Sequence, residues 1–179
     1  WYNKIMNLWH DLKSGTADRL TVIIELAKGS KNKYEIDKET GLIALDRVAY
    51  TTQDFPFDYG FIPQTLWEDN DPVDVILLTT YPLVPGLLVH ARPVGLLKMV
   101  DSGEPDDKII AVPIDDPRWE GVKDLNDINK HTLKEMEHFY STYKNLQNKV
   151  VTVSGFEPKA EAIKVFQRGC ELYQQKLPK

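Results

Sequence analysis

The sequence contains a single cysteine, Cys170, so no disulfide can form within the chain. Sparse cysteine fits a reducing compartment, and we expect a cytoplasmic protein. No apolar run approaches the roughly 20 residues that a transmembrane helix needs. The longest candidates, such as residues 75–78, have only the length of a strand. We therefore expect no membrane partner.

An excess of basic residues is also missing, since 22 Lys and Arg face 27 Asp and Glu, for a formal net charge of -5. This balance argues against a general nucleic-acid binder, whose affinity depends on neutralising phosphates. An acidic enzyme that acts on an anion would need metal ions or locally clustered Lys and Arg.

Several well-known motifs are absent. A calcium loop of the EF-hand type beginning at Asp69 would need a ligand at Val73, a glycine in place of Asp74 and a glutamate in place of Thr80. The chain has no Gly-Lys-Ser/Thr phosphate loop, no Gly-x-Gly-x-x-Gly fingerprint and no Gly-x-Ser-x-Gly elbow. These absences exclude the motif-based versions of calcium signalling, nucleotide binding and serine hydrolysis.

The composition is that of a globular protein, with 42% hydrophobic and 27% charged residues. A length of 179 residues suits one domain with a core of ordinary size. We expect residues 1–179 to form a single domain, in which residues 1–15 are an N-terminal extension or a helix.

Short apolar and β-branched runs separated by turn residues dominate the chain. Strands are expected at residues 20–26, 34–37, 42–48, 75–80, 87–92, 94–100, 109–112 and 149–156. Residues 5–12 suggest a short helix, the aromatic stretch 55–63 an irregular segment, and Pro93 an interruption between two strands. The last third predicts one helix capped by Asp124 or Asn126 and a second beginning at Pro158. The pattern predicts an α+β, mainly β protein, with a small barrel and one or two helices packed on it.

An acidic turn stands before one of the buried strands, in the sequence Asp69-Asn70-Asp71-Pro72-Val73-Asp74. Carboxylates are the hard oxygen ligands that magnesium, manganese and calcium prefer, and crowded carboxylates repel one another unless a cation intervenes. Asn70 tolerates the left-handed region that such a turn can require. Taken alone, the six residues are more typical of a solvated turn.

Other side chains could join this turn in a site for a phosphate-rich anion. The candidate acids are Glu25, Glu35, Asp101 and Asp106, and the candidate bases and phenols are Lys33, Arg47, Tyr59, Lys108, Tyr143 and Lys144. Several of them have a simpler explanation: edge-strand charges for the two glutamates, a hairpin loop for residues 101–108, surface pairing with Asp46 or Asp37 for Arg47, an apolar helix face for Tyr143, and favourable interaction with a helix terminus for Lys144.

The acidic turn is similar to the signature of the soluble family I inorganic pyrophosphatases. Further blocks resemble that family in the same order, at residues 22–25, 33–38, 46–47, 58–63, 92–95 and 98–101, followed by Asp106, Lys108 and the pair Tyr143-Lys144. The resemblance implies a five-stranded barrel of the oligonucleotide-binding (OB) type with flanking helices. It also implies a cytoplasmic homo-oligomer, with a hexamer favoured and a dimer possible, that hydrolyses pyrophosphate with several Mg²⁺ ions, for which Mn²⁺ is a possible substitute.

The resemblance also assigns roles to residues. It implies metal ligation by Asp69, Asp74, Asp101 and Asp106, with Glu25 and Glu35 close to the ions, a general base in Asp71, and phosphate binding by Lys33, Arg47, Tyr59, Lys108, Tyr143 and Lys144. A water activated by two metal ions would attack one phosphorus while Asp71 accepts its proton. The sequence departs from the family pattern at Phe55, where many members have a tyrosine, and at Asn70, where glycine is commoner.

Two alternatives remain. The first is another magnesium-dependent phosphohydrolase that acts on nucleotides. The second is a barrel that binds single-stranded nucleic acid, although the acidic balance of the chain argues against it.

Overall fold

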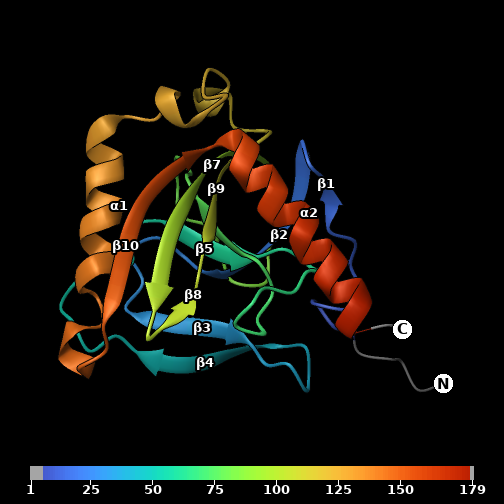
Figure 1. Cartoon of the computed structure of the whole chain (residues 1–179), viewed down its shortest axis with the longest axis horizontal. Coiled ribbons are helices and arrows are strands. Elements are labelled where there is room, and N and C mark those ends of the chain that lie inside the picture. Colours follow the sequence, from blue (N-terminus) through green and yellow to red (C-terminus); the bar gives the residue numbers. More distant parts are fainter. Residues whose placement is uncertain (1–5, 178–179) are drawn as a thin grey trace.

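A computed structural model describes residues 6–177, which form a strongly twisted sheet flanked by two helices (Figure 1). The strands are β1 (Gly15–Thr16), β2 (Arg19–Leu26), β3 (Asn32–Ile36), β4 (Ile43–Val48), β5 (Asp58–Phe61), β6 (Asp74–Leu77), β7 (Leu88–Asp101), β8 (Glu104–Pro105), β9 (Lys108–Pro113) and β10 (Val151–Pro158). The helices are α1 (Lys130–Thr142) and α2 (Lys159–Lys176), with short 3₁₀ turns η1 (Pro117–Trp119), η2 (Leu125–Asp127) and η3 (Asn145–Gln147).

Five strands close into a ring in the order β2, β5, β6, β9 and β7, because β7 also pairs with β2. Closure leaves these strands without free edges, which is how small barrels avoid pairing with other chains. Within the ring, β6 and β9 run parallel, and Asp74 stands beside Lys108 in their register. The predicted mainly β, α+β barrel with flanking helices is confirmed.

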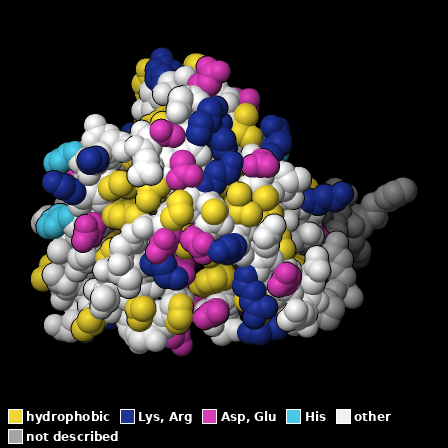
Figure 2. Space-filling model, turned by 45° about the horizontal axis from the view of Figure 1, so that its top comes forward, with side chains coloured by type: hydrophobic (Ala, Val, Ile, Leu, Met, Phe, Trp, Pro, Cys, Tyr) yellow, Lys and Arg dark blue, Asp and Glu magenta, His cyan; other side chains and the backbone are white. Residues whose placement is uncertain are grey.

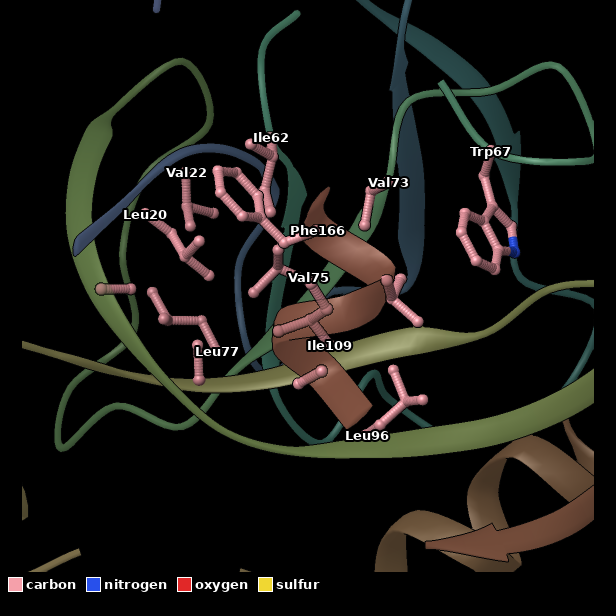
Figure 3. Packing of buried hydrophobic residues seen from close by; sticks show 14 of the residues in the cluster. Leu20, Val22, Ile62, Trp67, Val73, Val75, Leu77, Leu96, Ile109 and Phe166 are labelled. Carbon is pink, nitrogen blue, oxygen red and sulfur yellow. The ribbon is translucent and has the colours of Figure 1, made fainter. Parts of the chain in front are cut away.

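Alternation along the strands builds the core, because successive side chains of a strand point to opposite faces of a sheet. One set of inward residues, among them Leu20, Val22, Val75 and Leu77, is fully or almost fully buried and packs with Phe166 of α2. Figure 3 shows these side chains pointing toward one another in the space between the strands and α2. Residues on the opposite faces of β6, β7 and β9 form a second buried cluster together with Met136, Phe139 and Tyr140 of α1.

Close packing between Gly169 of α2 and the side chain of Val73 fixes the approach to the acidic turn. A Cβ atom at Gly169 of α2 would come within 2.4 Å of Val73, so only glycine permits this packing. The hydroxyl of Thr65 accepts a hydrogen bond from the backbone nitrogen of Val73 at 2.9 Å. Asn70 has a φ of 67°, the left-handed conformation expected from its residue type. The turn is therefore a shaped feature that rests on α2.

The hairpin of β3 and β4 forms a separate two-stranded sheet. In Figure 1 it lies below the lower ends of β7 and β8. Lys33 of β3 stands opposite Arg47 of β4, with a bulge directly after Lys33. The hairpin therefore presents two basic residues at one point of its surface.

Some predictions of local structure are wrong. Over its described part, the expected helix at residues 5–12 consists of turns and bends, while residue 5 lies outside the described residues. Pro93 does not separate two strands, because β7 continues through it with a shift of register between Pro93 and Gly95. The aromatic stretch contains β5, and Asp124 caps η2 whereas α1 begins later, with Asn129 as its cap.

Within residues 6–177, no helix has the length and apolar character needed to cross a lipid bilayer. On the face shown in Figure 2, acidic and basic side chains alternate, and apolar side chains are exposed between them.

Candidate functional site

The hairpin β3–β4 and the main sheet enclose a cavity of about 410 Å³. Every site residue predicted from the sequence lines it: Glu25, Lys33, Glu35, Arg47, Tyr59, Asp69, Asp71, Asp74, Asp101, Asp106, Lys108, Tyr143 and Lys144. They come from β2, both strands of the hairpin, β5, the acidic turn, the β7–β9 hairpin and the end of α1. Folding thus brings together residues separated by more than one hundred positions in the sequence.

Lys108 occupies the centre of the acidic part of this cavity. Its side chain is 3% exposed, and its Nζ lies 2.7 Å from Asp74 Oδ2 and 2.6 Å from Asp106 Oδ1. Nζ also donates a hydrogen bond of 3.0 Å to the hydroxyl of Tyr59. Burial opposes the charge, but the two carboxylates outweigh it and hold the pKa of Lys108 well above its usual value. A permanent positive charge therefore sits between two carboxylates.

A second pair of the same kind joins the end of α1 to the end of β7. Lys144 Nζ pairs with Asp101 Oδ2, and both side chains are largely buried. Burial disfavours the charged carboxylate, yet the hydrogen bond and the charge of Lys144 hold the pKa of Asp101 below its usual value. Tyr143, directly before Lys144, stacks on Phe139 and is also largely buried, and this desolvation raises the pKa of its phenol. Tyr143 therefore stays protonated near neutral pH and can donate a hydrogen bond.

The hairpin adds further charges to the cavity. Lys33 pairs with Glu35 on β3, and Arg47 pairs with its neighbour Asp46 on β4. Lys33, its partner Glu35 and Arg47 all line the cavity. Both basic side chains are within reach of an anion placed between the hairpin and Lys144.

Two acids are driven toward the protonated form by their surroundings. Glu25 is 4% exposed, and burial raises its pKa well above the usual value, although it accepts a hydrogen bond of 2.8 Å from the backbone nitrogen of Ile36. Burial is also the main reason that the pKa of Asp69 rises to about 6, and the charges of Asp74 and Asp71 add to it. A nearby cation would relieve this crowding of negative charge.

The donor set fits a hard divalent cation. Eight carboxylate side chains line the cavity: Glu25, Glu35, Asp69, Asp71, Asp74, Asp101, Glu104 and Asp106. Within residues 6–177, however, no three acidic, histidine or cysteine side chains converge closely enough to hold one ion as they stand. The reason is visible in the pairs above, because the amines of Lys108 and Lys144 occupy the carboxylate oxygens of Asp74, Asp106 and Asp101. Ligation would require these side chains to rearrange.

The sequence alone did not single out several residues that line the cavity, among them Lys38, Ser102, Glu104, Tyr140 and Lys149. A signal existed for Tyr140, which precedes Tyr143 by three residues and so shares its face of α1. Tyr140 is 3% exposed, and its ring centroid lies 5.9 Å from Lys108 Nζ. Phe55 also lines the cavity, where its ring packs 5.1 Å from that of Phe139.

Comparison with known proteins identifies relatives of this chain. A family model described as inorganic pyrophosphatase matches residues 22–174. Soluble inorganic pyrophosphatase 1 of Arabidopsis thaliana is 45% identical over 167 residues, which cover 92% of this chain and 79% of that protein. The inorganic pyrophosphatase of Haloferax volcanii is 44% identical, over 96% of this chain and 98% of its own.

A solved structure agrees with these sequences. The inorganic pyrophosphatase of Helicobacter pylori superimposes with a TM-score of 0.88 at 48% identity, and the match covers 91% of this chain and 98% of that one. The recognised blocks, the closed five-stranded barrel and the cavity thus agree with one another. This chain belongs to the inorganic pyrophosphatase family.

Proposed function

We propose that the chain hydrolyses inorganic pyrophosphate to two orthophosphates in a reaction that depends on divalent metal ions. One observation carries the proposal: eight carboxylates and six basic side chains face a single cavity. Carboxylates alone would suit a simple cation store, and basic residues alone a simple anion site. Their combination suits an anion that binds together with hard cations.

The basic side chains supply the substrate site. Lys33 and Arg47 face each other across the hairpin, and Lys144 approaches from the end of α1. Arg47 can bind a phosphate through two parallel hydrogen bonds, while the lysines act as point charges. The phenols of Tyr59 and Tyr143 remain protonated because burial raises the pKa of both, and they can donate hydrogen bonds to phosphate oxygens.

The acids supply the metal site. Asp69, Asp74, Asp101 and Asp106 would be the principal ligands, with Glu25 and Glu35 beside them, and we propose Mg²⁺ as the ion with Mn²⁺ as a substitute. Such ions supply charge neutralisation and a lower pKa for the attacking water. With Asp74 and Asp106 holding a cation, the amine of Lys108 would be free to bind a phosphate oxygen.

Asp71 is the proposed general base. Its carboxylate is about half exposed, and the backbone of the acidic turn holds its position at the cavity wall. A half-exposed carboxylate at the cavity wall can accept a proton from a water molecule, whereas the side chains of Asp74 and Asp106 are only 19% and 15% exposed. Hydrolysis needs no covalent bond to the protein, because the water attacks phosphorus and the second phosphate leaves.

A phosphate-release assay tests the function directly. We expect release from pyrophosphate in magnesium buffer, much slower release from ATP, and none when a chelator removes the metal. Asp71→Asn is expected to lower kcat by several powers of ten with little change in KM. The matched control is Asp54→Asn, since Asp54 is 51% exposed and pairs with Lys31 outside the cavity. Faster release from ATP than from pyrophosphate would favour the nucleotide-hydrolysing alternative.

We also propose a cytoplasmic homo-oligomer, with a hexamer favoured over a dimer, and no binding of nucleic acid. Large exposed apolar side chains support an interface between copies, notably Tyr81, Val84 and Val150, which are 69%, 63% and 74% exposed. Light scattering after size exclusion measures the assembly, and a titration with labelled single-stranded oligonucleotide tests the absence of nucleic-acid binding.

A further inference from the structure

The hairpin β3–β4 brings Lys33, Glu35 and Arg47 to the cavity, yet within residues 6–177 it pairs with no strand of the main sheet. Its position over the cavity therefore depends on other contacts. One is the hydrogen bond from the backbone nitrogen of Ile36 to Glu25 on β2. Another is made by Lys38, which lies two residues after the end of β3, in the turn of the hairpin.

Lys38 reaches from this turn to the acidic turn. Its Nζ pairs with Asp71 Oδ1 and donates a hydrogen bond of 3.2 Å to the backbone oxygen of Asn70. The turn that carries Lys38 is braced, because Asp37 Oδ1 accepts hydrogen bonds from the backbone nitrogens of Glu39 and Thr40 at 2.9 and 2.8 Å. The hydrogen bonds of Asp37 thus stabilise the turn from which the amine of Lys38 contacts the carboxylate of Asp71.

The backbone of Asp71 is fixed by other groups. Its nitrogen donates to Asp69 Oδ1 at 3.0 Å, and its oxygen accepts from the backbone nitrogen of Trp67 at 2.6 Å. These bonds do not fix the direction of the carboxylate. Among the residues that the structure describes, Lys38 alone pairs with that carboxylate through its side chain.

We propose that Lys38 is a positioning residue, which orients the carboxylate of Asp71 at the cavity wall and ties the phosphate-binding hairpin to the acidic turn. The inference rests on the proposed function, because it requires Asp71 to act on the attacking water. Lys38 itself takes no part in the chemistry. Its effect is transmitted through the direction of one carboxylate.

Replacing Lys38 by methionine keeps the length of the side chain and removes its charge. The pair is half exposed, so its loss is expected to leave the fold intact. We expect kcat for pyrophosphate to fall about tenfold, with KM within about twofold of the wild-type value. This lies between the few-fold worth of an exposed ion pair and the roughly hundredfold cost of misplacing a reacting group by about 1 Å.

The chain offers a closely matched control in Lys31. Its Nζ lies 3.1 Å from Asp54 Oδ1 and 2.6 Å from the backbone oxygen of Thr52, so it also contacts one carboxylate and one carbonyl. The exposures of the two pairs are nearly equal, 53% and 51% for Lys31 and Asp54 against 51% and 50% for Lys38 and Asp71. Lys31→Met removes the same charge outside the cavity and should leave kcat and KM unchanged.

Two further variants separate positioning from other roles. Lys38→Arg can still pair with Asp71, so we expect kcat within about threefold of the wild type. In an Asp71→Asn background, Lys38→Met should have no further effect on kcat, because the group that it positions is already lost.

Steady-state measurements of kcat and KM at saturating magnesium test the positioning role of Lys38. A kcat for Lys38→Met equal to that of Lys31→Met, a rise in KM alone, or an undiminished loss in the Asp71→Asn background would each overturn the positioning role. Absence of phosphate release by the wild-type protein would instead contradict the proposed function itself.

Discussion

Removal of the Lys108 charge is expected to destabilise the folded protein, because it leaves two largely buried carboxylates without their counterion. In Lys108→Met the apolar stem is retained, while Asp74 and Asp106 lose the amine that lies 2.7 and 2.6 Å from them. The side chains of these two acids are only 19% and 15% exposed, so water cannot replace the amine fully. Removing one partner of a buried ion pair costs about 3–5 kcal/mol.

Urea unfolding at pH 7 in the presence of EDTA measures this cost. In a parallel thermal unfolding experiment, a loss of 3–5 kcal/mol in the free energy of unfolding corresponds, for a chain of this size, to a fall in Tm of roughly 6–20 °C. The raised pKa of Lys108 means that its contribution is complete below its usual pKa of 10.5 and disappears only as the pH rises through its higher folded value. Lys164→Met is the control, because Lys164 is 68% exposed and, among residues 6–177, pairs only with Glu161 on the same helix face.

Added magnesium provides a second readout. A ligand at one hundred times its Kd stabilises the folded state by about 2.7 kcal/mol. We expect magnesium to stabilise Lys108→Met more than the wild type, because Asp74 and Asp106 then lack any competing amine. A variant within about 1 kcal/mol of the wild type in EDTA would refute the account of Lys108 as the counterion of these acids.

Three other perturbations have defined outcomes. Phe55→Tyr would add a phenol to the cavity and should lower KM for pyrophosphate by about 2- to 13-fold, the worth of one hydrogen bond of roughly 0.5–1.5 kcal/mol; an unchanged KM would show that the phenol does not reach the substrate. Gly60→Ala would place a Cβ atom 1.9 Å from the backbone oxygen of Ile23 and should destabilise the chain by about 3 kcal/mol in urea unfolding. Gly121→Ala should be nearly neutral, because no atom of the described part of the chain lies within 4 Å of the added Cβ. Partial burial raises the pKa of the Cys170 thiol, so at pH 8 its alkylation by iodoacetamide should be about tenfold slower than in urea. Equal rates measured by mass spectrometry would contradict this shielding.

Strands with clear alternation could be predicted from the sequence. Leu20, Val22 and Ile24 alternate toward one cluster of the core, and β2 covers the expected run. Strand β5 was missed, because two prolines close to it suggested irregular structure and its burial depends on β2 and β6. Pro93 likewise ends no strand, since the shift of register beside it absorbs the missing backbone donor.

The sequence could predict many of the residues that line the cavity, but not which of their side chains form ion pairs with one another. Single residues such as Glu25 and Asp101 carry no functional signal of their own, and only the ordered blocks of the family pointed to them. The sequence could not show that Lys108 and Lys144 occupy carboxylates, because that depends on the parallel register of β6 and β9 and on the path after α1. Lys38 was missed for the same reason, since its partner Asp71 lies on a different turn.

Anomalous diffraction from crystals soaked in Mn²⁺ tests the central claim most directly. The account predicts peaks inside the cavity, each about 2.0–2.6 Å from carboxylate oxygens of Asp69, Asp74, Asp101 or Asp106. It also predicts that the amines of Lys108 and Lys144 move away from these oxygens. A cavity without peaks, with Lys108 still paired with Asp74 and Asp106 and Lys144 still paired with Asp101, would contradict it.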